Sequence, residues 1–152
     1  MILALDLGAN VGWAAWFGPN DTAHGTMVFK NSRFEGGGMR WLRFRQWLTE
    51  VAESHGPIEQ VYFEEVRRHR GTDAAHAYGG FLAHLTAWCE KMEIPYQGKT
   101  VQAIKIHATG KGNANKAAVV AAVQARGFKV ETEDEGDAVA LMLLVTDKRK
   151  AA

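Results

Sequence analysis

Four acidic residues in three separated segments have the types and spacing that could do chemistry. Asp6 and Glu64 each end a short apolar run, and the pair Asp134 and Asp137 opens a longer one. Carboxylates beside buried apolar segments are costly unless something pairs with them, and a divalent cation can pair with several at once. Sites that hold two such ions about 4 Å apart are typical of enzymes that cut phosphodiesters. The pattern therefore predicts metal-dependent nuclease chemistry.

Each of these acids also has a structural interpretation that the residues alone leave open. Asp6 could cap the turn that follows it. Glu64 is followed by Glu65, and because neighbouring strand residues point to opposite faces, only one of the two can join Asp6. Asp134 and Asp137, three residues apart, would project from one face of the first turn of a helix. Negative charge at that position also stabilises a helix through its dipole.

Size and composition indicate a soluble globular protein. The chain has 152 residues, of which 47% are hydrophobic and 23% charged, so we expect one nuclease domain at 1–147 and a basic tail at 148–152. The longest apolar stretch, 138–145, is too short for a membrane span, and no signal peptide is visible. The single Cys89 fits a reducing compartment. We therefore expect a cytoplasmic protein without a membrane partner.

A net charge of +1 conceals clusters of basic residues. The clusters are Arg40, Arg43 and Arg45; Arg67, Arg68 and Arg70; Lys99, Lys105, Lys111 and Lys116; and Lys148 to Lys150. Two divalent ions on the four acids would raise the net charge to about +5. Positive patches of this kind suit a phosphate backbone, although any one cluster alone is also what a solvated surface carries.

The pattern of apolar runs and turn residues predicts an α/β protein. Expected strands cover 1–7, 11–17, 23–30, 60–66 and 94–97, and expected helices run from just after Gly36–Gly38 to Gly56, over 73–92, 100–108 and 117–126, and from near Asp134 onward. Asn113 or Asn115 would cap the helix at 117–126. Three strands followed by alternating helix and strand imply a mixed sheet with helices on both faces.

Four segments occur in an order that is characteristic of one protein family. They are Ile2–Gly8 with Gly12–Ala14, Val61–Glu64, Lys105 with Thr109–Lys116, and Asp134–Ala138. Their order and spacing agree over almost the whole chain, from Met1 to about Val145, with the RuvC family of Holliday junction resolvases, which the chain resembles. The resemblance is greatest to the compact versions encoded by phages, within the RNase H-like superfamily. The resemblance implies an RNase H-like fold whose mixed central sheet has three antiparallel strands first and then parallel strands.

The resemblance also implies an activity and the residues that carry it. Asp6, Glu64, Asp134 and Asp137 would hold two Mg²⁺ or Mn²⁺ ions per active site, with Glu65 a bystander, and Lys116 would neutralise charge on the scissile phosphate. The reaction would be the resolution of four-way DNA junctions by paired symmetric nicks that leave a 5′ phosphate and a 3′ hydroxyl. The residues expected to bind DNA are Arg67, Arg68, Arg70, Lys105, Lys111 and Lys116.

One departure from the family concerns the loop after the second acidic segment. Family members often carry an aromatic residue there that contacts bases, whereas this chain has Arg67-Arg68-His69-Arg70. Guanidinium groups can stack on bases and bind phosphates, so the loop could still enter a junction. Two symmetric nicks suit a homodimer, for which the helix 73–92 with Gly79-Gly80 is the expected surface, unless this helix simply packs against the sheet.

Three alternatives remain at this stage. An RNase H-like nuclease for flaps, forks or structured RNA would use the same four acids. A nucleotide-binding module like the sugar kinase and actin superfamily also begins with Asp-x-Gly, but it needs a second lobe that this chain is too short to hold, so no nucleotide cofactor is expected. A catalytically inactive DNA-binding relative is disfavoured because all four acids are present. Trp41, Phe44 and Trp47 are expected in the core, and Cys89 lacks the setting of a nucleophile.

Overall fold

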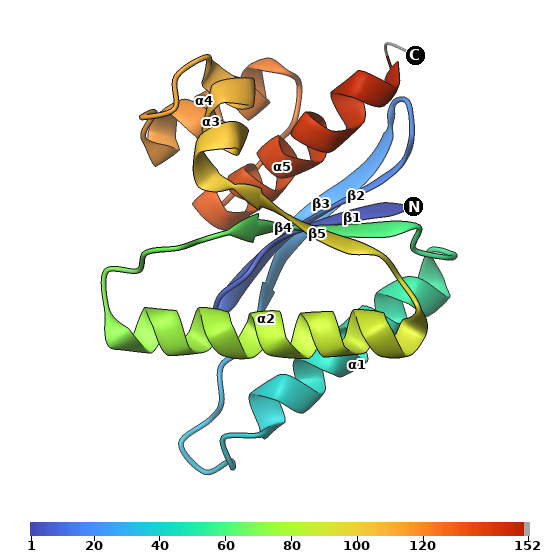
Figure 1. Ribbon diagram of the computed structural model, residues 1–152, viewed down its shortest axis with the longest axis vertical. Helices are drawn as coiled ribbons and strands as arrows, with labels where there is room; N and C mark the ends of the chain where they lie inside the picture. The colour runs from blue at the N-terminus through green and yellow to red at the C-terminus, as the bar shows by residue number, and fades with distance from the viewer. Residues whose placement is uncertain (151–152) are drawn as a thin grey trace.

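The computed structural model describes residues 1–150, with five strands and five helices (Figure 1). In chain order these are β1 (Ile2–Asp6), β2 (Asn10–Gly18), β3 (Asp21–Val28), α1 (Met39–Ser54), β4 (Gln60–Glu65), α2 (Thr72–Met92), β5 (Tyr96–Thr100), α3 (Val101–Thr109), α4 (Lys116–Ala125) and α5 (Glu133–Lys150). Residues 151–152, the end of the expected basic tail, lie outside the described residues, and 148–150 form the end of α5.

The strands form one mixed sheet in the order β3-β2-β1-β4-β5. β1 pairs antiparallel with β2 and β2 antiparallel with β3, whereas β1 pairs parallel with β4 and β4 parallel with β5. The predicted mixed sheet, antiparallel strands first and parallel strands after, is therefore confirmed. Because β1 and its parallel neighbour β4 run in the same direction, their carboxyl ends meet at one edge of the sheet, where ligands bind in such folds.

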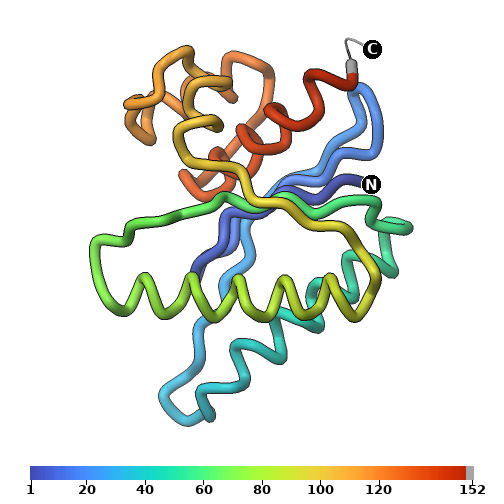
Figure 2. Tube along the Cα trace, viewed as in Figure 1, coloured from blue at the N-terminus to red at the C-terminus, as the bar shows by residue number. Residues whose placement is uncertain are grey.

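Helices cover both faces of the sheet. α1 and α2 lie on one face and α3, α4 and α5 on the other (Figures 1 and 2). The side chains of β1 alternate between these layers: Leu3 and Leu5 are buried in the cluster under α1 and α2, and Ala4 is buried in the cluster under α5. A small residue at position 4 lets α5 lie close to the sheet, which brings its first turn next to the end of β1.

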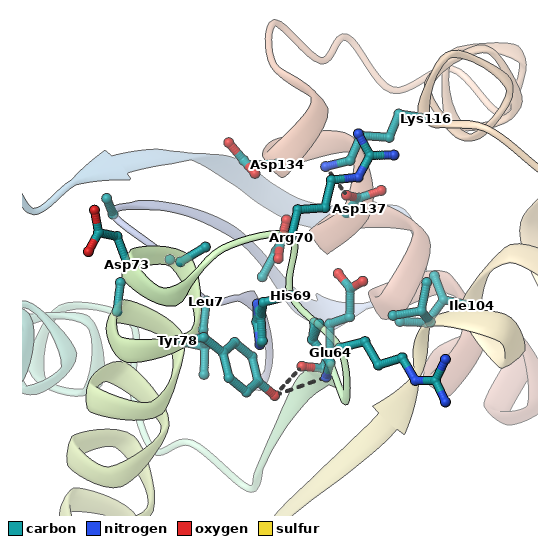
Figure 3. A pocket seen from close by; sticks show the side chains of 18 of the residues that line it. Leu7, Glu64, His69, Arg70, Asp73, Tyr78, Ile104, Lys116, Asp134 and Asp137 are labelled. Carbon is teal, nitrogen blue, oxygen red and sulfur yellow. Dashed lines mark hydrogen bonds and ion pairs between the residues drawn. The ribbon is translucent and has the colours of Figure 1, made fainter.

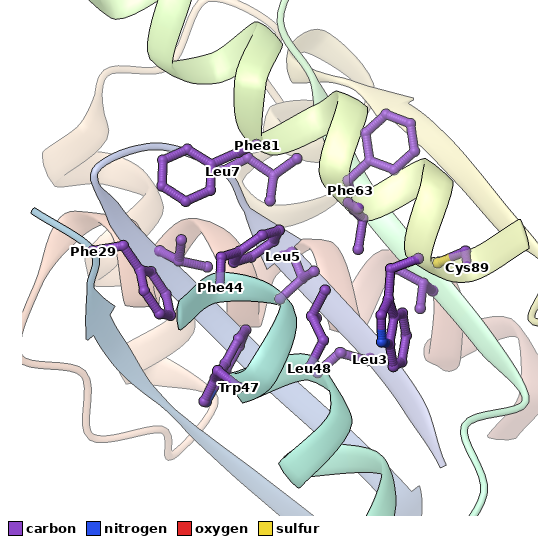
Figure 4. Close-up of a cluster of buried hydrophobic side chains, with 14 of the residues drawn as sticks. Leu3, Leu5, Leu7, Phe29, Phe44, Trp47, Leu48, Phe63, Phe81 and Cys89 are labelled. Atoms are coloured by element: carbon purple, nitrogen blue, oxygen red, sulfur yellow. The ribbon is translucent and has the colours of Figure 1, made fainter. Parts of the chain in front are cut away.

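The layer under α1 and α2 is rich in aromatic residues (Figure 4). Phe44 and Trp47 of α1 are buried, and the Phe44 ring meets the Phe81 ring of α2 edge-on at 5.0 Å between centroids. A Cβ atom at Gly80 would lie 2.3 Å from the half-buried ring of Trp41. Phe44 and Trp47 are thus core residues as predicted, whereas Trp41 is half-buried and packs against the core cluster. Gly80 serves the packing of α2 against α1.

The start of the fifth strand differs from the sequence-based expectation. The fifth strand begins at Tyr96 rather than at Ile94, because the end of α2 uses the preceding residues. Glu93 adopts a left-handed conformation with φ 57°, and the backbone N–H of Ile94 donates back to the oxygen of Cys89.

Among the described residues, no helix combines the length and the apolar character that a membrane crossing requires.

Candidate active site

Three of the four predicted acids converge at the carboxyl end of β1. Asp6 ends β1, Glu64 lies near the end of the adjacent β4, and Asp137 lies in α5 beside both. One carboxylate oxygen of each lies within 4.8 Å of the other two. Asp134, one helical turn before Asp137, lines the same cavity but does not belong to this group of three (Figure 3).

The structure distinguishes Glu64 from Glu65. The Glu64 side chain faces the cavity with Asp6, while Glu65 does not line it. Glu65 instead lies beside β5, where a Cβ atom on Gly98 would be 3.2 Å from its own Cβ, and its carboxylate is 3.8 Å from the guanidinium of Arg67. The alternation of side chains along β4, which left two candidates in the sequence, thus places only Glu64 in the acidic group.

The first turn of α5 is fixed against β2 and β3 by contacts that sequence reasoning missed. A Cβ atom at Gly12 of β2 would lie 1.9 Å from the backbone oxygen of Asp134, so the helix start can reach this position only over a glycine. Glu135 is 6% exposed, and its carboxylate lies 2.5 Å from Nδ1 of His24 on β3. The hydroxyls of Thr26 and Thr132 lie 2.8 Å apart. These contacts position Asp134 and the rest of the turn relative to Asp6.

A partial signal for these contacts exists in the sequence. Glycine inside a strand marks a close backbone approach, which is the role that Gly12 has. The position of Glu135 indicates only an acid that stabilises a helix start, and its partner His24 lies 111 positions away in the chain. No spacing rule connects two residues that distant.

The three converged carboxylates resist ionisation. Burial raises the pKa of Asp6 well above its ordinary value, and the negative charges of Glu64 and Asp137 raise it further. Burial also raises the pKa of Glu64. The pKa of Asp137 rises to about 7, first through burial and then through the charge of Glu64. Burial and mutual repulsion both oppose the ionised forms of these carboxylates. A divalent cation would supply positive charge that stabilises the ionised forms.

The donor atoms fit a divalent cation of the hard class. All three converged groups offer carboxylate oxygens, the ligands that Mg²⁺ and Mn²⁺ prefer. The raised pKa values agree with this assignment, because a bound cation would favour the ionised forms. The acidic group of Asp6, Glu64 and Asp137 can therefore bind a metal ion.

Lys116 is the basic side chain nearest the acids. Its ammonium nitrogen lies 3.8 Å from Asp137 and 4.0 Å from Glu133. Burial lowers the pKa of Lys116, but the surrounding carboxylates, Asp137 first, outweigh burial and raise it. Lys116 begins α4, and the side chain of Asn115 caps this helix by accepting a hydrogen bond of 2.8 Å from the Ala118 N–H. Of the two expected caps, the structure uses Asn115.

The acids lie in a cavity of about 750 Å³ with basic residues along its lining. The predicted DNA-binding residues Arg68, Arg70 and Lys105 line the cavity together with Lys116. Arg70 and Lys116 are labelled in Figure 3. Arg40 lines the cavity as well. Two predicted residues, Arg67 and Lys111, are exposed and lie outside the lining.

The Cys89 thiol plays no part in this site. It is fully buried, and burial raises its pKa to about 12. A thiol in this state carries almost no thiolate at neutral pH, so Cys89 is not a nucleophile. This agrees with the sequence-based expectation.

Solved structures with the same architecture exist. RuvC from T. thermophilus in complex with a Holliday junction substrate superimposes with a TM-score of 0.78 and 23% sequence identity, over 99% of this chain and 95% of that one. The chain has the RuvC fold. A second Thermus thermophilus RuvC structure gives a TM-score of 0.76 at 23% identity, over 99% of this chain and 96% of the other.

A more distant structure extends the comparison. The yeast mitochondrial Holliday junction resolvase Ydc2 gives a TM-score of 0.60 at 14% identity, over 91% of this chain and 74% of that one. No protein-family model matches the sequence, and no curated protein sequence matches it. The resemblance read from four sequence segments therefore agrees with the RuvC fold, and at these identities the agreement concerns the fold.

Proposed function

We propose that this chain is a structure-selective DNA endonuclease that resolves four-way junctions by paired, symmetric nicks. The observation that carries the proposal is the convergence of the Asp6, Glu64 and Asp137 carboxylates within 4.8 Å, inside a cavity lined by lysine and arginine. The RuvC fold supports it, since one of the structures with this fold is a complex with a Holliday junction substrate.

In this proposal the four acids hold two Mg²⁺ or Mn²⁺ ions. Asp6, Glu64 and Asp137 form the centre of the ion site, and Asp134, on the same helical face, completes it from the cavity wall. Bound ions of this kind lower the pKa of an attacking water and stabilise negative charge on a leaving oxygen. The expected products are a 5′ phosphate and a 3′ hydroxyl.

The basic residues of the chain would bind and orient the phosphate backbone. Lys116, within 4 Å of Asp137 and Glu133, is placed to exchange these contacts for the scissile phosphate and to offset its charge in the transition state. Arg68, Arg70 and Lys105 would hold phosphates along the cavity. The exposed Arg67 and Lys111 would extend the same contact outside it. Contacts of this type fix position without reading sequence.

Two symmetric nicks require two active sites, so we propose a homodimer related by a two-fold axis. The outer face of α2 carries small exposed residues, Gly79, Ala83 and Ala87, which allow close approach of a second copy. Gly80 is committed to Trp41 and does not belong to that surface. We expect a dimer by sedimentation at micromolar concentration and a monomer after Ala83→Arg; a monomeric wild-type protein would contradict the dimer.

A second candidate is an RNase H-like nuclease that acts on flaps, forks or structured RNA. Arg68 and Arg70, which line the cavity, favour this second candidate, because guanidinium groups can hold the phosphates of many branched structures. The experiment that separates the two candidates is cleavage of an end-labelled four-way junction in Mg²⁺, run beside flap, fork, linear duplex and hairpin RNA of equal length.

The four-way junction should be nicked at symmetric positions and much faster than the other substrates. Equal cleavage of flaps and forks would favour the second candidate. The absence of cleavage on every substrate, in both Mg²⁺ and Mn²⁺, would contradict nuclease function altogether. An Asp6→Asn variant, expected to bind the junction without cutting it, excludes a contaminating nuclease.

A further inference from the structure

A side chain from α2 holds the end of β4 beside the acidic group. The hydroxyl of Tyr78 donates a hydrogen bond of 2.8 Å to the backbone oxygen of Glu64 and accepts one of 3.1 Å from the backbone N–H of Val66 (Figure 3). Tyr78 is 7% exposed, so little water competes for either bond. One hydroxyl thus satisfies two backbone groups on either side of Glu65, the last residue of β4.

These bonds replace the ones that a longer β1 would have made. The backbone groups of successive residues in β4 point to opposite neighbouring strands, so residues two apart point to the same strand. The Val61 N–H donates toward the β5 side, so the corresponding groups of Glu64 and Val66 point toward β1. The pairing of β1 with β4 ends one residue before Glu64. β1 therefore stops supplying partners at the point where the cavity opens, and the Tyr78 hydroxyl acts as both the donor and the acceptor that are missing.

We propose that Tyr78 is a positioning residue, which fixes the backbone of Glu64 so that its carboxylate is held in the acidic group. This inference rests on the proposed function, because it assigns Tyr78 a role toward the divalent ions of that site. A ligand whose backbone is anchored on only one side would sample positions outside the group. Partners that orient a metal ligand typically change metal affinity by about 10- to 100-fold when they are removed.

The same residue anchors the basic loop. The imidazole of His69 packs on the Tyr78 ring, with 4.9 Å between the ring centroids and 46° between their planes. His69 lies between Arg68 and Arg70, both of which line the cavity. The hydroxyl of Tyr78 therefore serves the ion site and its ring serves the loop that we expect to contact DNA. The two functions can be separated by substitutions that remove one or both.

Tyr78→Phe keeps the ring and removes the hydroxyl. We expect its dissociation constant for Mn²⁺, measured by calorimetry without DNA, to rise about tenfold or more, while its affinity for a four-way junction in EDTA stays at the wild-type value. Tyr78→Leu removes the ring as well and should also weaken junction binding in EDTA. Tyr96→Phe is the matched control, because it loses a tyrosine hydroxyl bond of 2.9 Å to Glu90 on the protein surface. This control should bind Mn²⁺ like the wild type.

Amide hydrogen exchange gives a second readout that needs no metal. In Tyr78→Phe the Val66 amide should lose protection, whereas the Val61 amide, which is bonded to the Pro95 oxygen, should keep it. Unchanged Mn²⁺ affinity in Tyr78→Phe, in a protein whose wild type binds Mn²⁺ and cuts DNA, would overturn the role of Tyr78 and leave the proposed function standing. A wild type that binds no Mn²⁺ and cuts no DNA would overturn the proposed function and this inference with it.

Discussion

Replacing Asp137 with asparagine should stabilise the metal-free protein at pH 8, although it removes a proposed metal ligand. The side chain is 15% exposed and lies among other acids, so its negative charge is unfavourable without a cation. Burial and the charge of Glu64 raise its pKa to about 7. Asparagine has nearly the same shape and carries no charge. The substitution therefore removes the repulsion and retains most of the packing.

The size and sign of the effect follow from the pKa. A carboxyl with a raised pKa contributes stability that is complete below its ordinary value of 3.8 and is lost as the pH rises through about 7. At 1.36 kcal/mol for each tenfold change in proton affinity, the rise from 3.8 to about 7 corresponds to about 4 kcal/mol at pH 8. Lowering the pH to 5 should restore more than half of this.

Another perturbed carboxyl titrates outside this range. Hydrogen bonds, first from Arg126 and then from His107, lower the pKa of Asp147 to about 2. A depressed pKa contributes stability that is present above the ordinary value and is lost as the pH falls toward 2. Measurements between pH 5 and pH 8 therefore report on the acidic group with little contribution from Asp147.

The assay is urea unfolding of the wild type and of Asp137→Asn in EDTA at pH 5, 6, 7 and 8. We expect the variant to be more stable at pH 8 and the difference to shrink toward pH 5. Saturating Mn²⁺ should reverse the order, because only the wild type keeps the full set of ligands and binding stabilises the folded state. Equal stabilities at pH 8 in EDTA, or a difference that does not change with pH, would refute the reasoning.

Three further experiments test other parts of the account. Gly12→Ala should lower the free energy of unfolding by about 3 kcal/mol and the melting temperature by roughly 6–12 °C, because the new Cβ meets the backbone at the start of α5. The control is Gly8→Ala, whose new Cβ has its nearest neighbour at 3.8 Å and which should melt like the wild type. Glu64→Gln should slow junction cleavage more than about a hundredfold, and Glu65→Gln should leave the rate within a few-fold. The Cys89 thiol should react with a disulfide reagent at pH 8 only after unfolding in guanidinium, since it is buried and its pKa is about 12; rapid reaction of the native protein would show that this part of the core opens.

Local patterns in the sequence were sufficient to predict most of the architecture. Apolar runs that end in an acid located β1 and β4, and an apolar run that follows a pair of acids located the start of α5. Chain order then implied the mixed sheet. Because the carboxyl ends of parallel strands meet at one edge of a sheet, topology favoured a site where Asp6 meets one of the two acids that end β4. Distinguishing Glu64 from Glu65 required either the family resemblance or the structure, since alternation along a strand gives two phases and the residues do not choose between them.

The contacts that hold the site together were beyond sequence reasoning. Tyr78 satisfies the backbone of Glu64 only because α2 crosses the point where β1 leaves β4, a geometry that no spacing encodes. The pairing of His24 with Glu135 joins residues 111 positions apart. The role of Gly80 is similar: a glycine in α2 permits close approach, but only packing reveals that Trp41 is what approaches it.

The most direct test of the central claim is the cleavage of a four-way junction by the wild type and by Asp137→Asn, with both proteins shown to bind the junction in EDTA. The account predicts paired symmetric nicks by the wild type in Mg²⁺, no cleavage in EDTA, and junction binding without cleavage by the variant. Cleavage by Asp137→Asn at a rate near that of the wild type would contradict the assignment of the acidic group as the nuclease centre.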